Sequence, residues 1–110
     1  MPAIQRQVKL FYTRLSDILR NYFNDKFNVH SSQATSDELM VLLSVYLQDE
    51  KDRTQFYQLL RLSDAVKFAK YIPSNDQNEA AVQIAINTLQ HMDKLTERIK
   101  QNAERVAATY

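Results

Sequence analysis

Apolar residues recur along the first part of the chain at alternating spacings of four and three. The positions are Ile4, Val8, Phe11, Leu15, Ile18 and Tyr22. This spacing is typical of one face of an α-helix, and Leu19 and Phe23 widen the face to the breadth that a globular core needs. We therefore predict a helix over about residues 3–26. Asn28 is the residue that best tolerates the left-handed conformation in which such a helix ends.

A second apolar pattern begins behind a polar start signal. Thr35 and Glu38 have the spacing of a capping box, in which each side chain satisfies a backbone N–H of the other residue. The pattern predicts a helix over about residues 36–47, with Met40, Val41 and Val45 as secondary contacts. The inward positions are Leu39, Leu42, Leu43 and Tyr46.

The third pattern follows a charged turn at residues 48–53, where Asp49 or Asp52 is placed to cap a helix. It predicts a helix over about residues 51–70, continuous or kinked near residue 63. Pro73 disfavours the helical conformation at Ile72 and so ends this helix. The inward positions are Phe56, Leu59, Leu60, either Leu62 or Ser63, then Ala65, Val66 and Ala69.

Ser74 and Gln77 form a second capping box and start the last pattern. It predicts a helix over about residues 75–108, with Val82, Ala85, Ile86, Leu89 and Met92 facing inward. Five of the sixteen residues at 95–110 are charged. The sparse apolar positions Ile99, Ala103 and Val106 have heptad-like spacing, so we expect an extended or a frayed helix end. The patterns together predict an all-α fold, a compact bundle of four to five helices in one domain spanning residues 1–110.

Composition narrows the classes of protein that remain. Of 110 residues, 45% are apolar and 25% charged, which is ordinary for a globular protein. Glycine is absent, so tight hairpins and phosphate-cradling loops are disfavoured. Cysteine is absent too, and no apolar run approaches the roughly 20 residues that cross a bilayer, so we expect this piece of chain to be soluble.

Residues with catalytic or metal-binding chemistry are few and scattered. His30 and His91 lie far apart in the sequence, and Asp93 is two residues from His91, which places the two side chains on different faces of a helix. The serines lie where helix caps and turns need hydroxyls, and the carboxylates of residues 49–52 lie in a solvated turn. We expect no enzyme activity, no metal and no cofactor.

Two surfaces remain as candidates. Arg6, Lys9 and Arg14 make the first helix basic, which fits a solvated face, a nucleic-acid contact or the cytoplasmic flank of a membrane span. The stretch at residues 62–76 (LSDAVKFAKYIPSND) holds the second surface. Its members are Asp64, Lys67, Lys70 and Tyr71. Asp64 and Lys67 are one helical turn apart and can form an ion pair. Alternatively, Asp64 caps backbone donors while the aliphatic part of the Lys67 side chain covers the core, or both residues belong to a contact with a partner.

Three segments resemble one family when taken together. They are FYTRLSDILRNYFNDKFNV, QATSDELMVLL and LLRLSDAVKFAKYIPSND, within residues 8–92. Their combination is similar to the helical region that follows a membrane span in aerotolerance-type (Bat, BatD-like) bacterial membrane proteins. Asp64, Lys67, Phe68 and Ala69 carry over as signature positions, and no catalytic residue does.

The resemblance implies a non-enzymatic protein-interaction domain on the cytoplasmic face of the bacterial inner membrane. The implied partners are a MoxR-type AAA+ ATPase or von Willebrand factor A proteins, in an aerotolerance or envelope-stress system. The chain departs from the family by lacking a span, so it would be an excised domain or a soluble relative. The alternative is a free-standing helical regulator that touches nucleic acid through the basic first helix. A homodimer is left open by the seam at residues 92–106.

Overall fold

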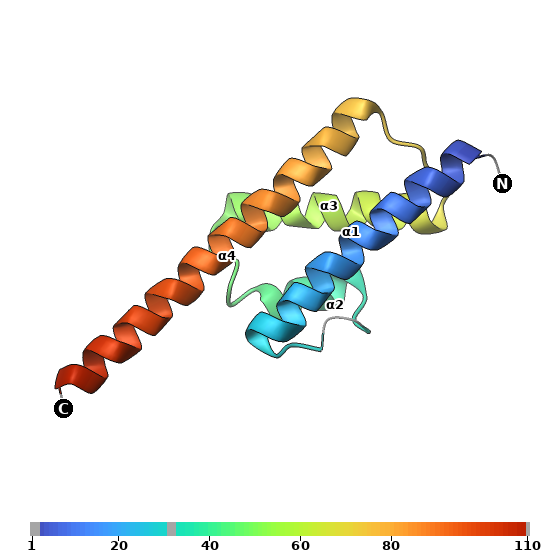
Figure 1. Ribbon diagram of the computed structural model, residues 1–110. Coiled ribbons are helices and arrows are strands. Elements are labelled where there is room, and N and C mark those ends of the chain that lie inside the picture. The colour runs from blue at the N-terminus through green and yellow to red at the C-terminus, as the bar shows by residue number, and fades with distance from the viewer. Residues whose placement is uncertain (1–2, 31–32, 110) are drawn as a thin grey trace.

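The computed structural model describes residues 3–30 and 33–109, and these ranges form four α-helices without a strand (Figure 1). The helices are α1 (Ala3–Phe27), α2 (Ser36–Leu43), α3 (Glu50–Phe68) and α4 (Asn75–Thr109). The predicted all-α bundle is confirmed. No helix in the described ranges combines the length and the apolar character that a bilayer crossing requires.

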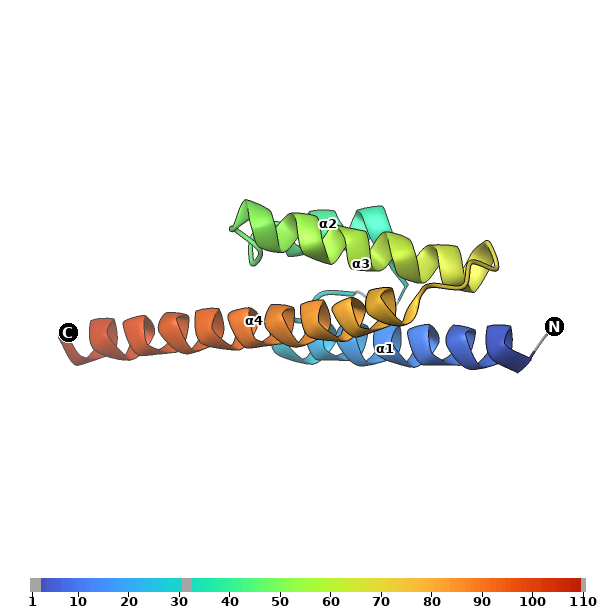
Figure 2. The same cartoon turned by 90° about the horizontal axis from the view of Figure 1, so that it is seen from above.

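The helices form two layers. Figure 2 shows α1 and α4 in one layer and α2 and α3 in the other. α1 and α4 run in the same direction, and the C-terminal half of α4 extends beyond the other helices (Figure 1). The radius of gyration is 16.1 Å, against about 13 Å for a typical domain of this length. The overhang of α4 accounts for this excess and for the longest extent of 63 Å.

The core lies between the two layers. All helices contribute fully buried side chains, among them Tyr12, Phe23, Leu39, Leu43, Phe56 and Met92. The rings of Phe23 and Phe56 meet edge to face at 5.6 Å, which joins α1 to α3. Among the residues that the structure describes, the hydroxyl of Ser63 is buried without a hydrogen-bond partner. Such a group costs free energy, so apolar packing must offset it here.

The inward faces of α1 and α4 are rotated relative to the predicted ones. On α1 the buried set is Tyr12, Ser16, Leu19 and Phe23, whereas Ile4, Phe11 and Ile18 are exposed. On α4 the buried set is Ala81, Ala85, Thr88 and Met92, whereas Val82 and Ile86 are partly exposed. Both helices pack on α3, so the side of each helix that faces the α2–α3 layer is the side that is buried. Leu19, Phe23, Ala85 and Met92 are buried as predicted. The other predicted positions are half-buried at the edge of the core (Val8, Leu15, Tyr22 and Leu89) or exposed (Ile4, Phe11, Ile18, Val82 and Ile86).

Two smaller predictions about α2 were wrong. Leu42 is 39% exposed, and Leu47 takes its place in the core. The helix ends at Leu43 rather than near residue 47, because the Ser44 hydroxyl and amide both bond to the carbonyl of Val41 and tighten the last turn. Arg53 donates to the carbonyls of Leu47 and Gln48, which holds the turn into α3.

The helix ends otherwise follow the predicted signals. Thr35 Oγ1 accepts from the amide of Glu38, and Asn28 has a positive φ of 54°. Asp49 caps α3, which runs without a break through residue 63. The amide of Gln77 donates to Ser74 Oγ, and Gln77 Oε1 accepts from the amide of Ser74 in return. The second capping box is therefore complete.

Polar side chains join α1 to α4 at two places along the helices. The Tyr12 hydroxyl donates to Asn78 Oδ1 at 2.7 Å, and burial raises the pKa of Tyr12. Farther along, the Tyr22 hydroxyl donates to Asp93, which also pairs with Lys26 at 3.4 Å. Burial and then the bond to Asp93 raise the pKa of Tyr22 well above its usual range. The bond from Tyr22 first, and Lys26 second, lower the pKa of Asp93.

The Asp93 contacts predict a pH dependence. A carboxyl whose pKa is lower in the folded state stabilises the fold above its ordinary pKa of 3.8, and this contribution disappears as the pH falls through that region. We expect Asp93→Asn to be less stable than wild type from pH 5 to 7, by a small amount because the group is exposed. Urea titrations should show the difference shrinking below about pH 4. A difference that is constant down to pH 2 would contradict the linkage.

Candidate functional site

The candidate surface surrounds the C-terminal end of α3, where the chain turns toward α4. α3 ends at Phe68, and Lys70 has a φ of 58°. The carbonyl of Ala65 accepts from the amides of Ala69 and Tyr71, so the chain folds back over the helix end. Helix ends of this kind usually place glycine at the left-handed position, and this chain has none. A buried Pro73 then leads into the Ser74 cap of α4.

Asp64 is held by another helix. Its Oδ2 accepts a hydrogen bond of 2.6 Å from the hydroxyl of Ser36, the first residue of α2. Among the described residues, salt-bridge distances join Lys26 to Asp93 and the His91 ring to Asp52, and none joins Asp64 to Lys67. Asp64 thus links α3 to the start of α2, where the positive end of the helix dipole favours a carboxylate.

Lys67 and Phe68 point outward at the end of α3. Phe68 is 79% exposed, and the ammonium of Lys67 lies 5.6 Å from the centre of its ring. This distance is within the range of a cation–π contact. Phe68 follows the buried Val66 by two residues, which is about 200° around a helix, so its side chain is directed away from the core.

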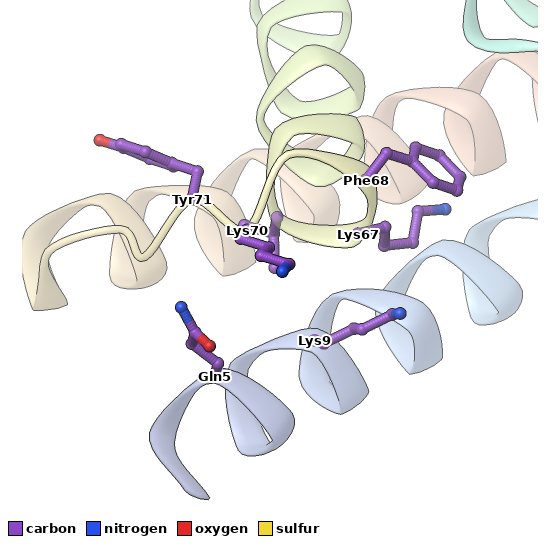
Figure 3. A pocket seen from close by; sticks show the side chains of 7 residues that line it. Gln5, Lys9, Lys67, Phe68, Lys70 and Tyr71 are labelled. Carbon is purple, nitrogen blue, oxygen red and sulfur yellow. The ribbon is translucent and has the colours of Figure 1, made fainter. Parts of the chain in front are cut away.

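A hollow of about 260 Å³ lies between this helix end and α1 (Figure 3). Its lining includes the ammonium-bearing residues Lys9, Lys67 and Lys70, together with Gln5, Val66, Phe68 and Tyr71. No carboxylate is among the described residues of this lining. Three cations beside an exposed aromatic ring form a surface that attracts acidic groups and offers them an apolar contact.

A second hollow, of about 450 Å³, lies toward α2. Lys67 and Phe68 line this hollow as well as the first, so they separate the two. Its other lining residues are Ser16, Asp17, Arg20, Gln33, Ala34, Thr35, Ser36 and Asp64. Arg20 is engaged there, since its guanidinium donates to the Ala34 carbonyl and the Ser16 hydroxyl.

The structure brings the predicted residues together only in part. Lys67, Lys70 and Tyr71 share one surface, and Lys9 joins them from α1. Arg6 and Lys9 line a further hollow with Leu10 and Thr13, and Arg14 is not among the described residues that line this hollow or the two before it. Sequence reasoning did not place Phe68 and Gln5 on the surface. The two-residue step from an inward Val66 was the signal for Phe68, and Gln5 had no signal.

Three further side-chain contacts join separate segments of the chain. His91 Nδ1 lies 2.8 Å from Asp52 Oδ2, which joins α4 to the first turn of α3. Tyr57 donates to Asp37 at 3.2 Å, and Tyr71 donates to Gln77 at 2.9 Å. Within residues 3–30 and 33–109 no three histidine, aspartate or glutamate side chains gather as metal ligands would.

Comparison with known proteins assigns no family. No protein-family model matches the chain, and no curated protein and no solved structure is significantly similar to it. The surface chemistry of the described residues and the resemblance of the three segments are the remaining indications of function.

Proposed function

We propose that this chain is a non-enzymatic protein-interaction domain that docks a partner on the surface formed by Lys9, Lys67, Phe68, Lys70 and Tyr71, here named the lysine–aromatic surface. The exposure of Phe68 carries the proposal. Its ring is the most exposed of the large apolar side chains described, at 79%. Aromatic side chains that are exposed in the free protein and buried in a complex often dominate binding energies.

The charges around Phe68 indicate the chemistry of the partner. In the first hollow Phe68 lies with Lys9, Lys67 and Lys70, and no carboxylate is among the described residues of that lining, whereas Asp17 and Asp64 line the second hollow on its other side. A partner segment with acidic side chains for the lysines and an apolar side chain that packs on Phe68 would match this surface. Electrostatic attraction would accelerate its association. Asp64 supports the surface from below through its bond to Ser36.

The resemblance to aerotolerance-type membrane proteins supports a specific setting. In that setting the domain lies on the cytoplasmic face of the bacterial inner membrane, tethered by a span outside this sequence. Its partner is a MoxR-type AAA+ ATPase or a von Willebrand factor A protein. The signature positions Asp64, Lys67, Phe68 and Ala69 then mark the docking surface and its support.

The test is a pulldown of the purified ATPase and von Willebrand candidates with paired variants. We expect Phe68→Ala and Lys67→Glu each to weaken capture at least about tenfold, as loss of a central contact does. The matched controls are Val41→Ala, which truncates a side chain 73% exposed on α2, and Lys51→Glu, at the opposite end of α3. Equal capture by Phe68→Ala and wild type would contradict the proposed surface.

Nucleic-acid binding through Arg6, Lys9 and Arg14 is the outcome that would replace this proposal. Phosphate contacts release counterions, so such binding falls steeply and linearly on a logarithmic salt scale. A gel shift with random-sequence DNA and RNA from 50 to 200 mM salt distinguishes the two functions. A protein partner centred on Phe68 should show the weaker salt dependence.

A further inference from the structure

The three lysines of the first hollow lack acidic partners within the fold. Lys9 comes from α1, whereas Lys67 and Lys70 come from the end of α3 and the turn behind it. Among the residues that the structure describes, no salt-bridge distance joins any of the three to a carboxylate. Like charges that share a hollow repel one another, and an anion that binds among them offsets this repulsion. The hollow is therefore suited to an acidic group from another molecule.

Lys70 adopts a backbone conformation that costs free energy for a lysine. Among the described residues, positive φ values occur at Lys70, with 58°, and at Asn28, with 54°. Both residues follow the end of a helix, α3 and α1 respectively. Asparagine tolerates the left-handed region because its short polar side chain can bond to the nearby backbone, whereas a lysine side chain gives no such compensation. Glycine or asparagine would therefore be less strained than lysine at position 70.

The fold needs the left-handed turn at position 70, but it does not need the lysine side chain there. The amides of Ala69 and Tyr71 both donate to the carbonyl of Ala65, so the residue between them turns the chain back over the helix end. The Lys70 side chain makes no hydrogen bond or ion pair with another described residue that would stabilise this turn. Strained residues of this kind cluster at positions that contact ligands.

The side chain of Lys70 leads into the first hollow. Figure 3 shows it directed from the end of α3 toward α1, where Lys9 lies, whereas Tyr71 is directed away from α1. The Tyr71 hydroxyl donates to Gln77 Oε1, which holds that ring on the α4 side. Lys9 and Lys70 line the first hollow and not the second. The two ammonium groups therefore share one space between α1 and the end of α3.

We propose that Lys9 and Lys70 form a subsite for a carboxylate of the partner, an aspartate or glutamate side chain, and that the left-handed backbone of Lys70 directs its ammonium into this subsite. The inference rests on the proposed function, because the subsite is one part of the lysine–aromatic surface. The carboxylate accepts hydrogen bonds from both ammonium groups while an adjacent apolar side chain packs on Phe68. Lysine at position 70 thus lowers the stability of the free protein and raises its affinity for an acidic partner.

Lys70→Gly tests the strain at this position. The variant keeps the turn and removes the unfavourable side chain, so we expect the equilibrium constant for unfolding to fall about threefold in urea titrations. Asn28→Gly is the matched control, because it makes the same change at the other left-handed residue, and it should alter this constant by less than about twofold. A Lys70→Gly variant that is no more stable than wild type would overturn the assigned strain.

A short acidic peptide tests the subsite. The probe is an acetylated and amidated Glu-Leu-Glu tripeptide, and its counterpart carries glutamine in place of both glutamates. In NMR titrations of the full chain we expect the acidic peptide to shift the amide signals of Lys9 and Lys70, and the glutamine peptide to leave them in place. Lys70→Gly and Lys9→Gln should each raise the dissociation constant at least about fivefold. Lys51→Gln, at the opposite end of α3, is the charge-matched control and should not raise it.

Two further variants distinguish a shared carboxylate from a general effect of charge. Lys70→Arg keeps the cation and should recover most of the affinity that Lys70→Gly loses. The double variant Lys9→Gln, Lys70→Gly should lose less affinity than the product of the two single losses, because both lysines act on the same carboxylate. Fully multiplicative losses would overturn the shared subsite.

Phe68→Ala separates this inference from the proposed function. If Phe68→Ala weakens peptide binding and Lys70→Gly does not, the docking surface is supported and the Lys9–Lys70 subsite is overturned. If wild type binds the acidic and the glutamine peptides equally, or shows no shift at Lys9 and Lys70 with millimolar acidic peptide, the subsite is likewise overturned. If peptide binding depends on Lys70 and not on Phe68, the subsite stands and the role of Phe68 in the proposed function is wrong.

Discussion

Replacing Phe56 by alanine is expected to lower the free energy of unfolding by about 3–5 kcal/mol. Phe56 is fully buried, and its ring meets that of Phe23 edge to face between α3 and α1. Truncation removes the apolar area and leaves a cavity that the rigid helices fill only in part. Domains of this size are stable by roughly 5–15 kcal/mol, so a single substitution would remove a large share of the total.

Urea unfolding followed by circular dichroism measures this loss as a lower midpoint at an unchanged slope. Phe68→Ala is the matched control, because it makes the same truncation on the same helix at a side chain that is 79% exposed. We expect it to change the unfolding free energy by less than about 0.5 kcal/mol. If the two variants lost similar amounts of unfolding free energy, Phe56 and Phe68 would not lie on a buried and an exposed side of α3.

Replacing Asp64 by alanine is expected to cost about 2 kcal/mol. The carboxylate accepts the hydroxyl of Ser36, which is only 8% exposed at the start of α2. Its loss leaves that hydroxyl with no acceptor and removes a negative charge from the positive end of α2. Asp64→Asn keeps an acceptor oxygen and should cost less.

The comparison with Lys67 decides between two roles for Asp64. No ion pair joins these two residues, so we expect Lys67→Ala to change stability by less than about 0.5 kcal/mol. A double-mutant cycle of Asp64→Ala with Ser36→Ala should show a coupling energy of about 1 kcal/mol or more. A cycle with Lys67→Ala that showed the larger coupling would reverse the assignment.

The helix bounds were largely predictable from the sequence. α1, α3 and α4 begin and end within about two residues of the predicted positions, and the Thr35 and Ser74 caps form as expected. α2 ended early because Ser44 bonds back to Val41, a turn that the apolar pattern at residues 45–47 concealed. Lys70 at a positive φ was missed, because long side chains carry no preference for that conformation.

The candidate surface was less predictable than the helices. Lys67, Lys70 and Tyr71 are neighbours in the sequence, so they lie close together whatever the tertiary structure. Lys9 reaches them from α1, nearly sixty residues earlier, through helix packing alone. For Asp64 the sequence left open an ion pair with Lys67, a helix cap or a partner contact, and its hydrogen-bond partner, Ser36, lies on another helix.

The sequence by itself determined that this protein is helical and where most of its helices start and stop. Caps, proline and apolar periodicity act through atoms within one turn of the chain, so they are present before any tertiary contact forms. Only the tertiary structure decided which side of each helix is buried. The stripe Phe11–Ile18 is as apolar as the buried set around Leu19, and α3 covers one of them because of where α1 lies across it. That choice depends on packing between distant segments, and it leaves Ile18 and Phe68 exposed.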